Sequence, residues 1–209
     1  MGFLSILGFG KSKEEKFWNW FCKNSAEIFD FEKDQEAIFD KIQAELGKID
    51  VNLTFEISSK KNSKRDFILS ADGILSLFPV VEALFSAKPA LPEWNFVKFR
   101  PRRAIGNSIR FGNIELFPRD VRFLLVDEED DENDKIGIVL FLRGFDGSAL
   151  FNQIGFLFLD ECLGEFDVET KVGGISFKDF DSEHFEKSKP LEELASTFDR
   201  AIAGKNVLS

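Results

Sequence analysis

The 209-residue sequence contains no tyrosine, one histidine and two cysteines. Without tyrosine the chain has no phenol for acid–base or nucleophilic chemistry, and the other common catalytic side chains are scarce. His184 has no second histidine and no nearby cysteine, which excludes a typical zinc site. Cys22 and Cys162 stand in apolar helical contexts, where we expect buried, unreactive thiols. We therefore predict no metal and no cofactor.

The sequence also lacks the glycine-rich motifs of nucleotide-binding and hydrolase sites, namely the P-loop, G-x-S-x-G and G-x-G-x-x-G. Its formal net charge is −10, because 37 acidic residues outweigh 27 basic ones. A charge of this sign opposes binding to nucleic acid, which requires a strongly basic face. It is typical of a soluble cytoplasmic protein or of a protein that binds basic partners.

The N-terminus lacks the signals of a targeting or membrane segment. Residues 1–10 are apolar, but no basic stretch precedes them, no cleavage site follows them, and they are too short to span a bilayer. Ile6 stands where a myristoylation signal requires Ser or Thr. We treat residues 1–16 as a short apolar and charged arm without stable membrane insertion. Its expected state is frayed or docked on the core, and weak association with a membrane surface is the alternative.

Phenylalanine is abundant, with 26 copies. Phe has nearly the shape of Tyr but no hydroxyl that must find a hydrogen-bond partner when buried. With an apolar fraction of 44 %, a core of Phe, Leu, Ile and Val forms without the help of disulfides. The apolar pattern therefore specifies the fold.

The first elements are predicted to be a pair of helices. Apolar residues follow near-helical spacing over 17–31, and Ile38, Ile42 and Leu46 recur every four residues within 35–49. After this pair the pattern changes to alternation with a period of two, which is typical of half-buried strands.

The order strand, strand, helix, strand then occurs twice. The first copy is expected at 53–57, 66–70, 74–87 and 95–100. The second copy is expected at 121–126, 136–142, 148–163 and 173–180. Between the copies, Gly112-Asn113 predicts a two-residue hairpin, and a last helix is expected over 191–203.

These elements predict an α+β fold. We expect one domain over residues 17–209, with a mainly antiparallel sheet, helices on one face, and ββαβ pseudo-halves at about 53–100 and 121–180. A parallel βαβ sheet is the alternative, which the pairing of strands into hairpins disfavours. The same strand order in both halves would support the pseudo-repeat.

One basic and one acidic segment contain the remaining candidates for a ligand-binding or catalytic site. The basic one, FRPRR at 99–103, contains Arg100 and Arg102, and arginine suits bidentate binding of carboxylate or phosphate. The acidic one, at 158–170, includes Asp160, Glu165 and Asp167, whose spacing fits no EF-hand loop. We expect the arginines to bind the acidic segment within the molecule. An anion-binding pocket made of the same residues is the alternative.

Two further features suggest contact with a partner. The acidic run 127–134 lies at a predicted hairpin tip, which is either simply solvated or a docking tip for a basic partner. Trp18 and Trp20 lie on opposite sides of their helix, because residues two apart do not share a face. We expect one of them in the core and the other at a protein interface.

Four segments carry a resemblance to known sequences: FWNWF at 17–21, ISSKK at 57–61 with RDFILSADG at 65–73, PALPEWNFVKFRPR at 89–102, and FLDECLGEFDVET at 158–170. They resemble an uncharacterised family of bacterial cytosolic proteins with a domain of unknown function. The resemblance covers most of the chain and implies no catalytic residue. Sequences of this kind are expected to have Tyr at some aromatic positions, such as that of Phe166. Natural drift and a tyrosine-depleted redesign are both open.

The function expected from these features is non-catalytic and cytoplasmic binding of another protein, in an immunity-type or chaperone-like role. Self-association through sheet edges or the first helices is a variant of the same prediction. The alternative is a small-ligand or anion-binding protein, or an enzyme, that uses Arg100, Arg102 and the carboxylates of residues 160–169.

Overall fold

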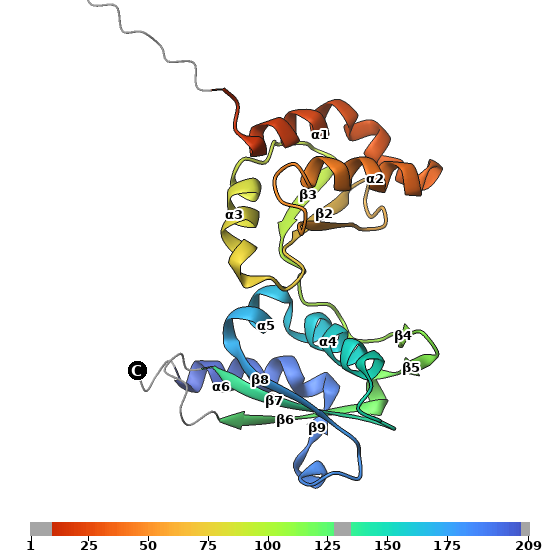
Figure 1. Ribbon diagram of the computed structural model, residues 1–209, viewed down its shortest axis with the longest axis vertical. Coiled ribbons are helices and arrows are strands. Elements are labelled where there is room, and N and C mark those ends of the chain that lie inside the picture. The colour runs from red at the N-terminus through yellow and green to blue at the C-terminus, as the bar shows by residue number, and fades with distance from the viewer. Residues whose placement is uncertain (1–9, 128–134, 206–209) are drawn as a thin grey trace, which may run out of the picture. The chain divides into compact units, whose positions relative to one another are not determined.

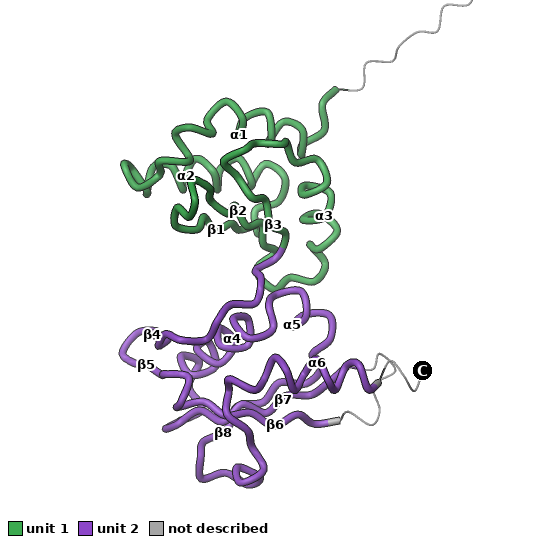
Figure 2. Tube along the Cα trace, turned by 180° about the vertical axis from the view of Figure 1, so that it is seen from behind, with its two compact units in different colours: residues 1–98 green, residues 99–209 purple. Residues whose placement is uncertain are grey.

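The computed structural model describes residues 10–127 and 135–205. The chain divides into two compact units, residues 1–98 and 99–209 (Figure 2). The sequence predicted one domain over 17–209, and the division between the two compact units falls between Lys98 and Phe99. Each unit contains its own sheet and its own buried apolar residues.

Unit 1 begins with the predicted helical pair. Its elements are α1 (Lys13–Phe29), α2 (Gln35–Leu46), β1 (Thr54–Ile57), β2 (Arg65–Ser70), α3 (Phe78–Ser86) and β3 (Trp94–Lys98). Ser12 and Glu15 form a capping box that fixes the start of α1. Pro79 lies in the first turn of α3, where its missing N–H costs no hydrogen bond.

The core of unit 1 is aromatic. The sheet has the order β1-β2-β3, in which β1 is antiparallel and β3 parallel to β2. Phe67 from β2 is fully buried, and its ring centroid lies 4.9 Å from that of Phe21 on α1. Trp94 of β3 lies 5.2 Å from Phe21 by the same measure, with the edge-to-face geometry that aromatic pairs prefer.

Unit 2 contains a small hairpin and a four-stranded sheet with helices (Figure 1). Its elements are β4 (Ile109–Phe111), β5 (Ile114–Leu116), β6 (Val121–Asp127), β7 (Ile136–Leu142), α4 (Ala149–Leu163), α5 (Glu165–Lys171), β8 (Val172–Lys178), β9 (Lys189–Pro190) and α6 (Leu194–Lys205). Short 3₁₀ turns are η1 (Phe31–Lys33) and η2 (Leu75–Leu77) in unit 1, and η3 (Pro118–Asp120), η4 (Phe185–Lys187) and η5 (Leu191–Glu193) in unit 2.

The larger sheet of unit 2 has the order β8-β7-β6-β9. β7 is antiparallel to β6 and parallel to β8, and β9 adds a short antiparallel edge beside β6. Buried side chains of β7 meet those of α4 and α6 in one cluster that includes Leu140, Phe158 and Phe198. Gly112-Asn113 forms the predicted turn of the β4-β5 hairpin.

The same strand order occurs in both units. β1-β2-β3 and β6-β7-β8 each consist of a hairpin, a helical crossover and a third strand that lies parallel beside the second. The α+β class, the mainly antiparallel pairing and the ββαβ pseudo-repeat are therefore confirmed. The strands form three small sheets, because each repeat closes on its own core and the β4-β5 hairpin pairs only within itself.

Candidate functional site

The basic and acidic segments of unit 2 meet, and Arg102 is the centre of the contact. Its Nε donates a hydrogen bond to the carbonyl oxygen of Leu163 at 2.9 Å. Its Nη1 donates to Asp199 Oδ2 at 2.9 Å, and its Nη2 donates to Asp167 Oδ2 at 2.5 Å and Asp199 Oδ1 at 2.8 Å. All three guanidinium nitrogens therefore have partners within unit 2.

The backbone reinforces this contact. The Arg100 N–H donates to the Glu165 side chain at 3.0 Å, and the Glu165 N–H donates back to the Arg100 carbonyl at 3.0 Å. Gly164 has φ +75°, a region that favours glycine. A Cβ at Gly164 would lie 3.0 Å from the Arg100 carbonyl oxygen and 3.1 Å from the Arg102 nitrogen. The close approach of the two segments therefore depends on the glycine.

The electrostatics favour the charged forms of Arg102 and Asp199. Hydrogen bonding from Arg102 lowers the pKa of Asp199 and, reciprocally, Asp199 raises the pKa of the Arg102 guanidinium. Glu165 is only 1 % exposed. An anion that bound Arg102 would have to displace carboxylates already in place, so the geometry favours the intramolecular network over the anion pocket.

The structure thus brings together four of the five residues that the sequence suggested for a ligand site: Arg100, Arg102, Glu165 and Asp167. The fifth, Asp160, lies in the last turn of α4 and accepts the Gly164 N–H through its backbone carbonyl at 2.8 Å. The sequence missed Asp199, which comes from α6 and is 97 residues away along the chain. No local pattern indicates a partner at that separation.

The other reactive side chains lie apart. Cys162 is buried, and burial raises the pKa of its thiol to about 12, as expected for an unreactive cysteine. Cys22 is exposed on α1, which corrects the expectation that it is buried. The Nε2 atom of His184 lies 3.5 Å from the Glu183 carboxylate. Within residues 10–127 and 135–205, no three His, Cys, Asp or Glu side chains are grouped as a metal site requires.

The two tryptophans proposed for an interface differ in burial. Trp18 is 3 % exposed, and its Nε1 donates to the Leu84 carbonyl at 2.7 Å, so it belongs to the core of unit 1 and offers no surface to a partner. Trp20 is half-buried, with its ring 6.1 Å from that of Phe17. The acidic tip at 128–134 and the arm at 1–9 lie outside the described residues.

A row of three phenylalanines in unit 2 forms a surface that the sequence did not indicate. We call Phe156, Phe177 and Phe145 the aromatic row. Phe156 of α4 is 45 % exposed and lies edge-on to Phe177 of β8, with ring centroids 5.1 Å apart. Phe177 lies 6.3 Å from Phe145 by the same measure. A Cβ at Gly155 would collide with the Phe177 ring, so this glycine allows β8 to lie close to α4.

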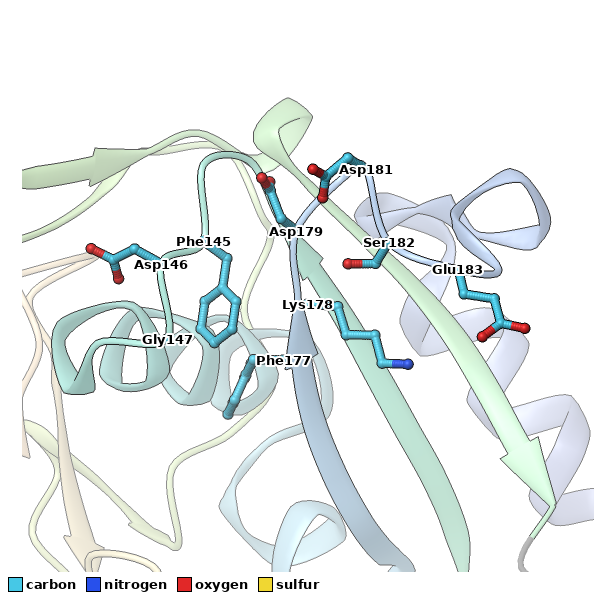
Figure 3. A pocket seen from close by; sticks show the side chains of 9 residues that line it. All are labelled: Phe145, Asp146, Gly147, Phe177, Lys178, Asp179, Asp181, Ser182 and Glu183. Carbon is cyan, nitrogen blue, oxygen red and sulfur yellow. The ribbon is translucent and has the colours of Figure 1, made fainter.

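The row continues into an open depression of about 590 Å³. Figure 3 shows the rings of Phe145 and Phe177, which both line it, beside each other. We call the carboxylates on its border the acidic rim, which consists of Asp146, Asp179, Asp181 and Glu183. Lys178 is the one basic residue that lines the depression.

Asp179 holds the loops of this rim in place. Its Oδ1 accepts the Gly144 N–H at 2.7 Å and the Phe180 N–H at 2.8 Å. Asp146, Asp181 and Glu183 are exposed. The combination can bind a partner that presents apolar and basic groups together.

No family model matches this chain, and no curated protein or solved structure matches it. The resemblance to an uncharacterised bacterial family therefore stays a prediction. Among the helices in the described ranges, none has both the length and the apolar character needed to cross a membrane.

Proposed function

We propose that the protein is a non-catalytic cytoplasmic protein that binds another protein through the aromatic row and the acidic rim of unit 2. The observation that carries this proposal is the aromatic row itself, because two of its rings, Phe177 and Phe145, line a depression together with four carboxylates. An immunity-type or chaperone-like role is a concrete form of such binding.

The energetics of the row support this use. Interface energy concentrates in a few aromatic side chains that a partner can desolvate. The Phe156 ring is held against Phe177, so little side-chain freedom is lost when a partner covers it. Leu157, 41 % exposed on the same helix, adds apolar area next to the ring in sequence. Phe156 and Leu157 lie on the open side of α4, which they share with the polar residues of the helix.

The charges specify the kind of partner. Four carboxylates and one lysine line the depression, and the whole chain carries −10. A basic partner is attracted to this region and a second acidic protein is repelled, with an association rate that falls as salt rises. The proposed partner therefore has a basic surface with exposed apolar groups.

The Arg102 network has a structural role in this proposal. Its three nitrogens hold α6 and the start of α5 against the segment at 99–103. Because the guanidinium nitrogens of Arg102 already bind groups within unit 2, an anion-binding or enzymatic function is the second candidate.

The test is affinity capture from lysate of the source cells, with bound proteins identified by mass spectrometry. Phe156→Ser is the test variant, and Phe166→Ser on α5 is its matched control, because both rings are 45 % exposed and both pack against another phenylalanine of unit 2. We expect the wild type and Phe166→Ser to capture the same stoichiometric basic partner and Phe156→Ser to lose it. Capture of no stoichiometric partner, or equal capture by all three, would contradict the proposal.

A further inference from the structure

The edge strand β8 borders the aromatic row. β8 pairs with β7 on one side, and within residues 10–127 and 135–205 no strand pairs with its other side. A register shift separates the pair Ile136–Val172 from the pair Ile138–Ile175, after which pairing is regular through Lys178. The segment Ile175–Lys178 is therefore a regular edge that offers backbone donors and acceptors to another strand.

The side chains of this edge alternate as a docking strand requires. Ile175 and Phe177 lie two residues apart on one face and pack partly against the core of unit 2. Both are half-buried because the edge leaves one flank open. Ser176 and Lys178 lie on the opposite face. An added strand with an apolar residue beside Phe177 would cover the open flank and extend the aromatic row.

The chain continues from this edge directly into the acidic rim. Asp179 follows Lys178, and Asp181 and Glu183 stand on the next turn (Figure 3). Basic side chains of an added strand would share the face of Ser176 and Lys178, and those at the end of the strand that passes Lys178 would approach these carboxylates. A second copy of this chain fits less well, since each copy carries −10.

We propose that β8 binds an extended segment of the partner protein as an additional strand, and that this segment alternates apolar and basic residues. This inference rests on the proposed function and specifies its binding mode. Main-chain hydrogen bonds then supply affinity, and alternate side chains supply specificity.

The test uses a blocked ten-residue peptide of alternating valine and lysine, labelled for fluorescence anisotropy against the full chain. Alternate amides of a strand point to opposite edges, so only one set faces β8. N-methylation of the valines and N-methylation of the lysines should therefore have opposite outcomes. We expect one of the two to weaken binding about tenfold or more and the other to leave it nearly unchanged. The same peptide with glutamate for lysine should not bind.

The protein variants separate local from overall charge. Asp181→Asn with Glu183→Gln removes two exposed rim charges, and Glu36→Gln with Asp40→Asn removes two exposed charges from α2 of unit 1. We expect the rim pair to weaken binding about threefold or more, and the matched pair to leave it unchanged.

Three outcomes would overturn the strand-addition inference. Equal binding of both N-methylated peptides excludes backbone pairing and leaves the proposed function standing. If the rim variant and the α2 variant weaken peptide binding equally, the overall charge of the chain attracts the peptide, and the acidic rim does not select its basic residues. A dimer in light scattering, with no binding of the lysine peptide, assigns the edge to a second copy. Capture of the partner by Phe156→Ser at the wild-type level, in contrast, would contradict the proposed function itself.

Discussion

The two units share one strand order but use their aromatic residues differently. In unit 1, Phe67, Phe21 and Trp94 meet edge-to-face inside the core. In unit 2, Phe156 and Phe177 meet in the same geometry at an open sheet edge. Within the described ranges, the exposed phenylalanines are Phe111, Phe156 and Phe166, and all three belong to unit 2. Equivalent ββαβ frames thus support a closed core in one unit and an exposed surface in the other.

The arginines extend the comparison. Arg65 of unit 1 is 3 % exposed and donates to the carbonyls of Phe29 and Ser58 at 2.8 and 2.9 Å and to the Glu32 carboxylate at 2.5 Å. Arg102 of unit 2 is also fully engaged, but its side chain is 33 % exposed. Both join segments far apart in the sequence, and neither is available to a ligand without loss of internal bonds. The surface features that distinguish unit 2 are therefore its rings and carboxylates.

The largest effect is expected from the aromatic core of unit 1. Phe67→Ala should lower the free energy of unfolding by about 3–5 kcal/mol, because it removes a fully buried ring and leaves a cavity. Phe156→Ala is the matched change in unit 2 and should cost about 1 kcal/mol or less, since its ring is 45 % exposed. Urea unfolding measures both, with tryptophan fluorescence to follow unit 1, in which all three tryptophans lie. Equal losses of unfolding free energy in the two variants would contradict the contrast between a closed aromatic core in unit 1 and an exposed aromatic surface in unit 2.

A smaller effect is expected at the junction of the basic and acidic segments in unit 2. Gly164→Ala should cost about 2 kcal/mol, because φ is +75° and the added Cβ meets the Arg100 carbonyl. Gly147→Ala is the control: φ is +83° there, but nothing lies near the Cβ, so about 1 kcal/mol of backbone strain remains. Far-UV circular dichroism during urea unfolding measures both. A smaller loss for Gly164→Ala than for Gly147→Ala would contradict the close approach of the two segments.

The smallest effect concerns pH. Arg102 lowers the pKa of Asp199, so the folded state holds this carboxylate ionised more strongly than the unfolded state, whose pKa is about 3.9. The stabilisation is full above the unfolded pKa and is lost as the pH falls through the lower folded pKa. Arg102→Met should therefore reduce stability at neutral pH by about 1 kcal/mol, a value discounted for partial exposure.

Acid unfolding measures this change. The difference between wild type and Arg102→Met should begin to narrow below about pH 4, and it should narrow further as the pH falls through the lowered pKa of Asp199 in the folded wild type. Lys41→Met, which breaks an exposed ion pair with Glu27 in unit 1, is the control and should show almost no change. A difference between wild type and Arg102→Met that grows as the pH falls would contradict the proposed linkage.

The sequence predicted much of the frame. Periodicity placed both strand pairs, the helices between them and the N-terminal helical pair close to their observed bounds. It missed α5, because Glu165 and Asp167 were considered only as partners of the arginines and no helix was expected directly after residue 163. Acidic residues also favour the first turn of a helix, and here they begin one. It also missed β9, which has only two residues and exists because β6 pairs with it.

The candidate site was less predictable than the fold, because its residues come together from elements that are distant in the sequence. Charge complementarity indicated that Arg102 binds the acidic segment, but it did not indicate Asp199 on α6. The aromatic row depends on which side of α4 meets the sheet. The polar residues Asn152, Gln153, Asp160 and Glu161 share one side of α4, and Phe156 lies on that side. The pattern therefore marks an outer face, but it does not show that a ring on this face meets a ring of β8. The packing of α4 against β8 determines that Phe156 joins the aromatic row.

The most direct test of unit 2 as the binding unit is amide hydrogen exchange with and without the valine–lysine peptide. We expect exchange to slow in Ile175–Lys178 of β8, whose outer amides lie on an open edge, and to stay unchanged in β2 and β3 of unit 1. Slower exchange in unit 1 on peptide binding would contradict the assignment of binding to the edge and aromatic row of unit 2. Bound peptide without slower exchange in either unit would contradict it as well.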